Sequence, residues 1–353
     1  MRNTIKHLQR LSLYGIVGLT LSVFGTSQVL GTIDKASNKQ LAKSYPGLVN
    51  SSLANTNLIQ ENGQVVKPLL DFLALFNIKH QGTVKSINAA MQENFIRKPG
   101  LERWDMVDSE VDKRLRTSAL KLLRNMDLVD AIPHFRVDVD YFILFGASLP
   151  RVEKRFDDFL TQYNAGTLQC KHIVLLGGVR KLQPSEITRM KAIAIPGISF
   201  ADFLKELNIK QSDLTETHML RFIWKAKATK LLKNQFQEHK NLFFIDCTNT
   251  TDGTNQRPTA ITTVQTWLKD YLPKPGSCHA NVEKPYGIRM EKGLRLELEK
   301  YSRQLVNLKK RFSITWNSPA SDPNLLLVIY KDELARTFLH EYNLKKYLGI
   351  IID

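Results

Sequence analysis

The chain has 353 residues, of which 43% are hydrophobic, and a formal net charge of +16. This length allows one large domain or two ordinary ones, and the composition excludes collagen-like, disulfide-rich and low-complexity chains. The positive charge either serves solubility alone or favours anionic partners such as anionic lipid and phosphorylated or carboxylated ligands. Because the sequence shows neither an arginine-rich arm nor a nucleic-acid-binding motif, we expect no nucleic-acid partner.

The N-terminus is typical of an export signal. Arg2, Lys6 and Arg10 precede the uncharged apolar stretch Leu11–Phe24, and small residues follow it. This order of a basic region, an apolar core and small residues is the layout of a signal peptide. The alternative is an uncleaved membrane anchor, although the apolar stretch is shorter than the roughly 20 residues that span a bilayer. We expect residues 1–27 to direct export to the periplasm or cell envelope, or to hold the protein at the membrane.

Helices are predicted in the part of the chain that follows. Residues 28–66 are rich in Ser, Asn and Gln and read as a poorly ordered linker or a segment lying along the surface. Apolar residues at helical spacing then predict helices over Pro68–Phe76, Ser86–Phe95 and Val107–Met126. We expect residues 67–136 to form a helical extension that packs on a larger domain. The apolar face of its third helix would consist of Val107, Val111, Leu115, Leu122 and Met126.

From residue 137 onward, apolar runs alternate with helical patterns. Runs such as FILF, IVLL and LFFI are typical of parallel strands that are buried on both faces. We therefore predict an α/β fold in which residues 137–353 form a Rossmann-like, mostly parallel sheet with helices on both faces. The predicted strands are Tyr141–Phe145, Ile173–Leu176, Leu242–Cys247, Cys278–Val282, Phe312–Trp316 and Leu325–Tyr330. The predicted helices are Arg151–Tyr163, Pro184–Ala192, Asp202–Leu207, Thr215–Phe236, Thr259–Tyr271, Ile288–Lys309 and Lys331–Tyr342.

The three cysteines give no sign of a metal site. Cys170, Cys247 and Cys278 fit no zinc-binding spacing, and each lies in or beside a predicted strand. We expect three buried free thiols, with one disulfide as the alternative in an exported protein. The histidines also lack metal-ligand spacing, so no metal is predicted.

The strongest functional signal is a pair of glycine turns after the first two strands. Gly146 follows one strand, and Gly177 and Gly178 follow the next. Ligands of α/β folds bind at the carboxyl ends of the strands, and helix N-termini there attract anions. Arg151, Arg155 and Arg180 would add positive charge. The turns lack both the dinucleotide fingerprint GxGxxG and the phosphate-loop Lys-Ser/Thr, so plain strand-to-helix turns are the alternative.

Further polar side chains follow the later strands. Glu186 begins the helix after the second turn, and Glu216 begins the long helix that precedes the third strand. The segment NTTDGTNQRPTAITT places Arg257 and Thr259 after the third strand, and Tyr286 follows the fourth. Because successive parallel strands bring their carboxyl ends to one edge, we expect these side chains near the glycine turns. For Glu216 the alternative is ordinary helix capping together with Thr215, and for Glu186 it is an ion pair with Arg180 that only fixes the loop.

In this order and spacing, the motifs resemble the YdcF/SanA-like family of bacterial α/β proteins, which are often tied to the cell envelope. The resemblance rests on FGASLPRVEKR, LLGGVRKLQPSE, LTETHM, NQRPTAITT and KPYGIR, between Asp138 and Glu299. It implies a Rossmann-like sheet, an envelope role and a nucleotide-like or S-adenosylmethionine-like ligand. The pocket residues that it implies are Gly146, Arg155, Gly177, Gly178, Arg180, Glu186, Glu216, Arg257 and Thr259.

The chain departs from this family at two motifs. Where more typical members carry Thr-x-Glu-Asn, this sequence reads Thr215-Glu216-Thr217-His218. Where they carry Thr-Thr-x-Asp-Thr, it reads Thr259-Ala260-Ile261-Thr262-Thr263. An amide and an acid are therefore missing, which bears on catalysis more than on fold.

Two functions are expected from these observations. In the first, an exported envelope protein binds a small anionic ligand that is nucleotide-like, S-adenosylmethionine-like or a sugar phosphate. Arg180 and Arg257 would then supply charge, Tyr286 would stack on the ligand or close the pocket, and Glu186 or Glu216 would act as acid or base in any reaction. In the second, the protein is a catalytically silent secreted module that binds partners through its basic surface. The sequence predicts no particular reaction and no oligomeric state.

Overall fold

The structure is a computed structural model. It describes residues 57–351, apart from 249–257 and 306–310. The predicted export segment and Arg257 lie outside the described residues. A five-stranded parallel sheet with the strand order β3-β2-β1-β4-β5 forms the centre. This arrangement confirms the predicted Rossmann-like α/β fold. The strands are β1 (Val137–Phe145), β2 (Leu168–Gly178), β3 (Leu242–Cys247), β4 (Ser277–Asn281) and β5 (Ser313–Asn317).

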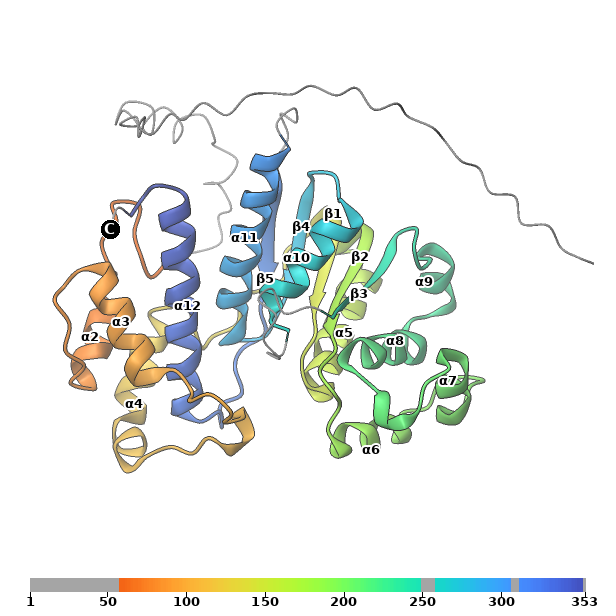
Figure 1. The fold of residues 1–353 in the computed structure, drawn as a ribbon, viewed down its shortest axis with the longest axis horizontal. Coiled ribbons are helices and arrows are strands. Elements are labelled where there is room, and N and C mark those ends of the chain that lie inside the picture. Colours follow the sequence, from red (N-terminus) through yellow and green to blue (C-terminus); the bar gives the residue numbers. More distant parts are fainter. Residues whose placement is uncertain (1–56, 249–257, 306–310, 352–353) are drawn as a thin grey trace, which may run out of the picture. The chain divides into compact units, whose positions relative to one another are not determined.

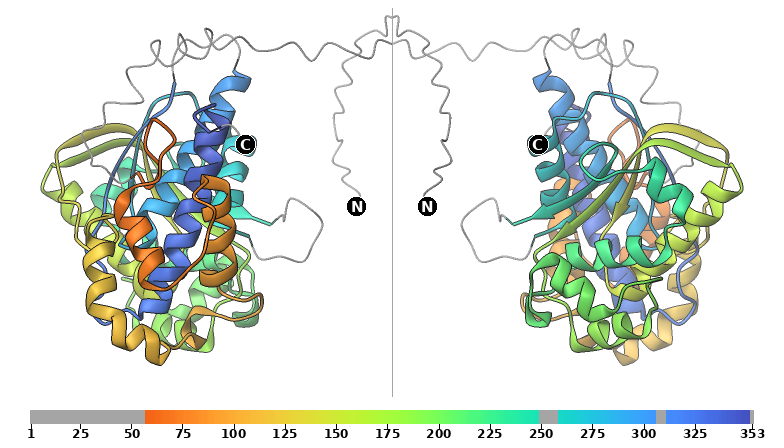
Figure 2. Two further views of the ribbon diagram at one scale, coloured as in Figure 1. Left: turned by 90° about the vertical axis from the view of Figure 1, so that its left-hand side faces the viewer. Right: turned by 90° about the vertical axis from the view of Figure 1, so that its right-hand side faces the viewer.

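Helices cover both faces of this sheet. On one face lie α5 and α8, and on the other lie α10 and α11 (Figure 1). Beyond α11 follows α12, which packs against α3 and α4 (Figures 1 and 2). The helices before α8 are α2 (Lys67–Leu75), α3 (Val84–Phe95), α4 (Glu110–Arg124), α5 (Leu149–Asn164), α6 (Pro184–Ala192) and α7 (Phe200–Leu207). The later ones are α8 (Glu216–Lys227), α9 (Lys230–Gln235), α10 (Ala260–Tyr271), α11 (Tyr286–Gln304) and α12 (Leu327–Tyr347).

The alternation of side chains along β1 divides the core into two clusters. Phe142 and Leu144 face the cluster that contains residues of α5 and α8. Ile143 and Phe145 face the cluster that contains residues of α10, α11 and α12 together with α2 to α4. All four side chains are buried, so the central strand is apolar on both faces, as its sequence predicts.

One predicted strand is wrong. Leu325–Tyr330 does not form a strand, because α12 begins at Leu327 and continues to Tyr347. A short apolar run fits a buried helix as well as a buried strand. The start of α12 is fixed by a distant side chain, since the Asp108 carboxylate accepts hydrogen bonds from the backbone N–H groups of Leu327 (3.1 Å) and Val328 (2.8 Å).

The predicted long helix Thr215–Phe236 is interrupted. It forms α8 and α9, and Ala228 and Thr229 are extended between them. The hydroxyl of Thr229 accepts a hydrogen bond from the backbone N–H of Leu232 and thereby caps a new helix. Threonine competes with regular helix geometry in this way, which explains the break.

The predicted apolar face of the third helix is also wrong in part. Val107 and Val111 are 78% and 45% exposed, and α4 begins only at Glu110. Asp112 is buried instead and forms an ion pair of 2.6 Å with Lys331 of α12. This buried pair turns the Asp112 side of the helix inward and leaves Val111 outside.

The cysteines agree with the prediction, since Cys170, Cys247 and Cys278 are all buried and free. Burial raises the pKa of Cys170 to about 12, so its thiol stays protonated at neutral pH. Among the helices that the structure describes, none is both long enough and apolar enough to cross a membrane.

Candidate functional site

The carboxyl ends of β1 and β4 define the candidate site. The chain leaves β1 toward β2 on one side, while β4 lies on the other side of β1. Such a reversal of strand order is the topological switch point at which open α/β sheets bind ligands. The loop after β1 contains Gly146, and the loop after β4 contains Glu283 and leads into α11 at Tyr286.

Arg180 connects two of the predicted acids. Its guanidinium donates to both carboxylate oxygens of Glu186, at 2.7 and 3.0 Å, and to the carbonyl oxygen of Ala147 at 3.0 Å. Its Nε lies 3.6 Å from Oε1 of Glu216. Burial favours neutral groups, but these contacts outweigh it, raising the pKa of Arg180 and lowering that of Glu186. Arg180 and Glu186 are therefore both charged and paired at neutral pH.

Glu186 also occupies the N-terminus of α5. Its Oε1 accepts a hydrogen bond of 3.0 Å from the backbone N–H of Leu149, the first residue of that helix. Its Oε2 accepts one of 2.8 Å from the N–H of Gln183 and caps α6. The place where a helix N-terminus would attract an anionic ligand is thus filled by a carboxylate of the protein itself.

Two of the predicted glycines make room for α8. A Cβ atom on Gly146 would lie 2.7 Å from Cδ of Glu216. One on Gly177 would lie 2.6 Å from Oγ1 and 2.9 Å from Cα of Thr217. Both distances are shorter than a side chain tolerates, so these glycines let the first turn of α8 pack against the strand ends.

A second ion cluster ties β1 to β4. Arg155 is buried and donates to both carboxylate oxygens of Glu283, at 2.7 and 3.1 Å. It also donates to the carbonyl oxygen of Phe145 at 2.7 Å, at the end of β1. Arg151 lies one turn earlier on α5, with its Nε 3.5 Å from Oε1 of Glu283. Burial opposes the charge on Glu283, but the two arginines prevail and lower its pKa.

Tyr286 and Glu333 organise a third group of charges beside this cluster. Arg151 donates a hydrogen bond of 2.6 Å to the Tyr286 hydroxyl, and its guanidinium carbon lies 4.1 Å from the ring centre. The guanidinium carbon of Arg103 lies 4.8 Å from the same centre. Glu333 is fully buried and accepts hydrogen bonds from Arg103 and, at 2.7 Å, from Arg289. Despite burial, these arginines lower the pKa of Glu333 to about 2.

The second and third groups together carry excess positive charge. The four guanidinium groups belong to Arg103, Arg151, Arg155 and Arg289, and the two carboxylates to Glu283 and Glu333. The local balance is therefore +2. The neighbouring Asp332 does not change it, because Asp332 is paired with Arg336 at 3.0 Å.

Two of these arginines reach the solvent. The side chains of Arg103 and Arg151 are 27% and 31% exposed, whereas that of Arg155 is 3% exposed. A ligand from solution can therefore contact Arg151 without unfolding the chain, whereas the guanidinium of Arg103 is turned toward Glu333 and its Nε is buried. Tyr286 itself is only 2% exposed, so it positions the two arginines and offers no free ring face to a ligand.

The other predicted residues belong to the turn beside β3. The Thr259 hydroxyl accepts a hydrogen bond of 3.2 Å from the N–H of Thr262 and caps α10. Gly178 faces Pro258. A Cβ atom added to Gly178 would lie 3.2 Å from Cβ of Pro258. The structure therefore gives Thr259 a capping role, and Arg257 is outside the described ranges.

Several members of the charged site were not predicted from sequence. Glu283 follows a strand just as Gly146 does, so the rule that ligands bind at carboxyl ends applies to it equally. Arg103, Arg289 and Glu333 come from segments that strand–helix alternation does not assign to this edge. No local motif marks them, because their role arises from packing between distant helices.

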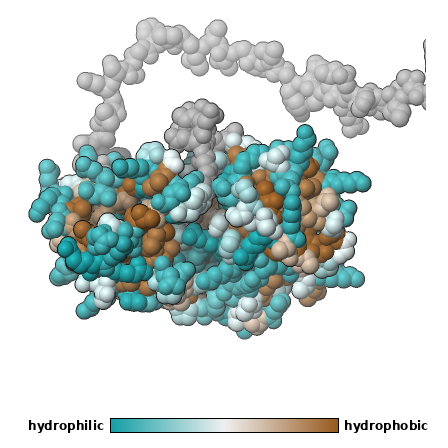
Figure 3. All heavy atoms as spheres, turned by 90° about the horizontal axis from the view of Figure 1, so that it is seen from below, coloured by the Kyte–Doolittle hydropathy of each residue, from teal (hydrophilic) through white to brown (hydrophobic). Residues whose placement is uncertain are grey.

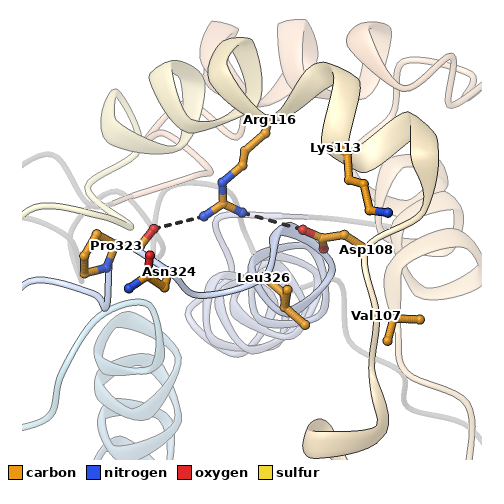
Figure 4. A pocket seen from close by; sticks show the side chains of 7 residues that line it. All are labelled: Val107, Asp108, Lys113, Arg116, Pro323, Asn324 and Leu326. Atoms are coloured by element: carbon orange, nitrogen blue, oxygen red, sulfur yellow. Dashed lines mark hydrogen bonds and ion pairs between the residues drawn. The ribbon is translucent and has the colours of Figure 1, made fainter.

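Two cavities are lined by residues other than those of the charged site. One of about 460 Å³ is formed by residues at the amino ends of β1 and β2, including Leu168 and Lys171. The other, of about 510 Å³, lies between α4 and the segment leading into α12 (Figure 4). Its lining residues are Val107, Asp108, Lys113, Arg116, Pro323, Asn324 and Leu326.

The described part of the chain contains no cluster of three or more His, Cys, Asp or Glu side chains that could hold a metal ion. The resemblance to the YdcF/SanA-like family stays a prediction, and function has to be argued from the charged site itself. Comparison with known proteins yields no match among family models, curated proteins or solved structures.

Proposed function

We propose that this protein binds a small anionic ligand at the carboxyl edge of its sheet, between the ends of β1 and β4. The observation that carries the proposal is the excess of guanidinium charge around Tyr286, with Arg151 partly exposed. Guanidinium groups form paired hydrogen bonds with phosphate and carboxylate oxygens. A ligand there would neutralise charge that the protein's own carboxylates leave uncompensated.

A phosphorylated compound suits this charge best. A phosphate monoester carries about −1.5 to −2 charges at neutral pH, which is close to the local balance of +2 around Tyr286. Nucleotides and sugar phosphates meet this condition. S-adenosylmethionine carries a positive sulfonium, so it suits the site less well.

The proposal includes binding but no reaction. Glu186 and Glu216, the predicted acid and base, are both held by Arg180. A paired carboxylate with a lowered pKa, such as that of Glu186, is a poor proton donor at neutral pH. We therefore propose an exported, envelope-associated binding protein, and export itself is proposed on the sequence of residues 1–27 alone.

Calorimetric titration with inorganic phosphate, ADP, a sugar phosphate and S-adenosylmethionine tests this function. We expect a phosphorylated compound to bind and to raise the melting temperature with its concentration. Arg151→Gln should weaken that binding roughly tenfold to a hundredfold, because a charge-assisted hydrogen bond contributes about 1.5–3 kcal/mol. The matched control is Arg303→Gln at the other end of α11, an arginine 45% exposed, which should leave affinity unchanged.

Two outcomes would contradict the proposal. One is the absence of heat and of a melting shift with every phosphorylated compound. The other is equal affinity of the wild type and Arg151→Gln, since the site would then lie elsewhere. In either case the alternative function would be favoured, in which the protein is a secreted module that binds partners through its basic surface.

A further inference from the structure

A row of apolar side chains protrudes from residues 101–111, next to the charged site. Among the residues that the structure describes, seven large hydrophobic side chains are exposed, and four of them lie in this short segment. They are Leu101 (40% exposed), Trp104 (61%), Val107 (78%) and Val111 (45%), and we call them the 101–111 ridge. Single exposed hydrophobics are ordinary, but a group of this size indicates an interaction surface.

Buried groups on either side force the ridge outward. In the 3-10 turn Arg103–Asp105, Arg103 points inward to Glu333, and the following Met106 is 5% exposed. Trp104, between these inward-facing residues, is left outside. At the start of α4, the buried pair of Asp112 with Lys331 holds Val111 on the outer side of the helix. The exposure is therefore built into the packing.

Cations accompany the apolar side chains of the ridge. The backbone N–H of Leu101 is bonded to the carbonyl of Lys98, so the exposed Lys98 belongs to the same turn. Lys113 lines the pocket of Figure 4 together with Val107. The exposed Arg114 follows Val111 by three residues on α4, which makes them neighbours on the helix surface.

Two exposed acids also lie in this segment. They are Asp105 and Glu110, and Glu110 is paired with Lys113 at 2.7 Å. Over residues 97–116 there are six cations and five acids, so the local balance is only +1: Arg97, Lys98, Arg103, Lys113, Arg114 and Arg116 against Glu102, Asp105, Asp108, Glu110 and Asp112. Attraction to an anionic surface therefore depends on the three exposed cations Lys98, Lys113 and Arg114 and on the net charge of +16 of the whole chain.

We propose that the 101–111 ridge docks on the surface of an anionic lipid bilayer. Tryptophan prefers the boundary between water and lipid, because its ring is apolar and its N–H is polar. Protruding apolar side chains enter a bilayer without needing a complementary groove, and the flanking cations attract anionic headgroups. On the face seen in Figure 3, apolar residues gather on the side of α2 to α4 and, separately, on the side of α6 to α8.

A second copy of the chain fits the ridge less well. Two chains of +16 each repel one another. Four side chains also fall short of the roughly 20 to 30 residues that each partner contributes to a stable protein interface. The charge complementarity therefore favours an anionic membrane over self-association.

Tryptophan fluorescence of the full chain tests this surface directly. The chain has four tryptophans, and only Trp104 is exposed. The other three are Trp224 (6% exposed), Trp267 (1%) and Trp316 (4%). The apolar N-terminal segment contains no tryptophan, so quenching by brominated lipid reports on Trp104 whether or not that segment also binds.

With vesicles of brominated phosphatidylcholine and phosphatidylglycerol, we expect quenching and a blue shift of the emission. Both should diminish as salt increases, because screening weakens attraction to headgroups. Substitution of Leu101 by Ser should lower the vesicle partition coefficient about tenfold, since burial of a leucine side chain contributes about that factor. Leu231→Ser is the matched control, because Leu231 is a 70% exposed leucine on α9. It should leave the partition coefficient unchanged.

Three outcomes would overturn the proposal. The first is binding to vesicles without quenching, since the N-terminal segment would then account for the contact. The second is equal partitioning of Leu101→Ser and Leu231→Ser. The third is concentration-dependent self-association in sedimentation velocity that Trp104→Ser abolishes, because the ridge would then bind a second copy. None of these results depends on whether the phosphorylated ligand binds.

Discussion

Substitution of Glu333 by Gln tests the charged site at its most buried point. The Glu333 side chain is fully buried between Arg103 and Arg289, and these arginines lower its pKa from 4.5 to about 2. A shift of that size corresponds to about 3 kcal/mol of stability at neutral pH. Loss of one partner of a buried ion pair costs about 3–5 kcal/mol in other proteins. We therefore expect Glu333→Gln to lower the free energy of unfolding at pH 7 by about 3 kcal/mol.

The pH dependence separates this charge effect from a packing effect. A carboxylate with a lowered folded-state pKa stabilises the protein above its unfolded-state pKa and loses this contribution as pH falls through the folded-state value. The difference between wild type and Glu333→Gln should therefore be constant above about pH 5.5. Below about pH 4.5 it should shrink by about 1.4 kcal/mol per pH unit.

Urea denaturation from pH 7 to pH 3.5 measures this difference. Asp71→Asn is the control, because Asp71 is 44% exposed in an i,i+4 pair with Lys67, and exposed pairs contribute about 0.5 kcal/mol or less. A loss below 1 kcal/mol at pH 7, or a loss that does not change with pH, would refute the electrostatic reasoning.

Two further substitutions address the other ion cluster. Arg180→Met should lower the free energy of unfolding by about 3–5 kcal/mol in urea denaturation, because it removes the cation that Glu186 and Glu216 share. The folded fraction of Arg180→Met should bind phosphate with the same affinity as the wild type in calorimetry. A loss of affinity in that folded fraction would show that Arg180 belongs to the binding site. Gly146→Ala should lower the melting temperature by several degrees, since the new Cβ would meet Glu216 at 2.7 Å and the Leu176 carbonyl at 2.9 Å; an unchanged melting temperature would show that α8 shifts freely.

Most of the sheet follows from local sequence. Predicted and observed strands overlap at all five positions, and Leu242–Cys247 coincides with β3. The reason is that a doubly covered parallel strand must be apolar throughout, which leaves a continuous apolar run between polar turns. The same reasoning fails at Leu325–Tyr330, because α12 is buried by neighbours on several sides and carries an equally continuous run.

The N-terminal helices show what local patterns omit. The pattern Val107, Val111 and Met126 predicts one inner face; Met126 is buried as predicted, but the two valines lie outside and Asp112 is buried instead. The deciding partner, Lys331, is more than 200 residues away in sequence. Hydrophobic periodicity takes only apolar residues into account. It therefore does not predict a buried ion pair between distant helices.

A polar stripe on α5 is visible in the sequence. Arg151, Arg155, Asp158 and Gln162 recur at helical spacing beside the apolar stripe of the same helix. In the structure this stripe faces polar side chains at β4 and β5: Arg155 binds Glu283, Asp158 accepts from Asn281, and Gln162 accepts a hydrogen bond from Asn317 at 2.7 Å. A helix that has an apolar and a polar stripe is expected to have two packing partners. The partner of the polar stripe of α5 is the carboxyl end of β4, which forms the switch point with β1, together with β5 beside it.

The balance of charge favours one of the two strand-end clusters as the proposed binding site. Around Arg180, one guanidinium meets two carboxylates, and Glu186 already fills the N-terminus of α5. An anion arriving there would have to displace a buried carboxylate that has its own hydrogen bonds. Around Tyr286, cations exceed carboxylates, and Arg151 is open to solvent. An anion arriving at this second cluster would meet uncompensated positive charge, so we expect the same edge of the sheet to contain one cluster that stabilises the fold and one that binds the proposed ligand.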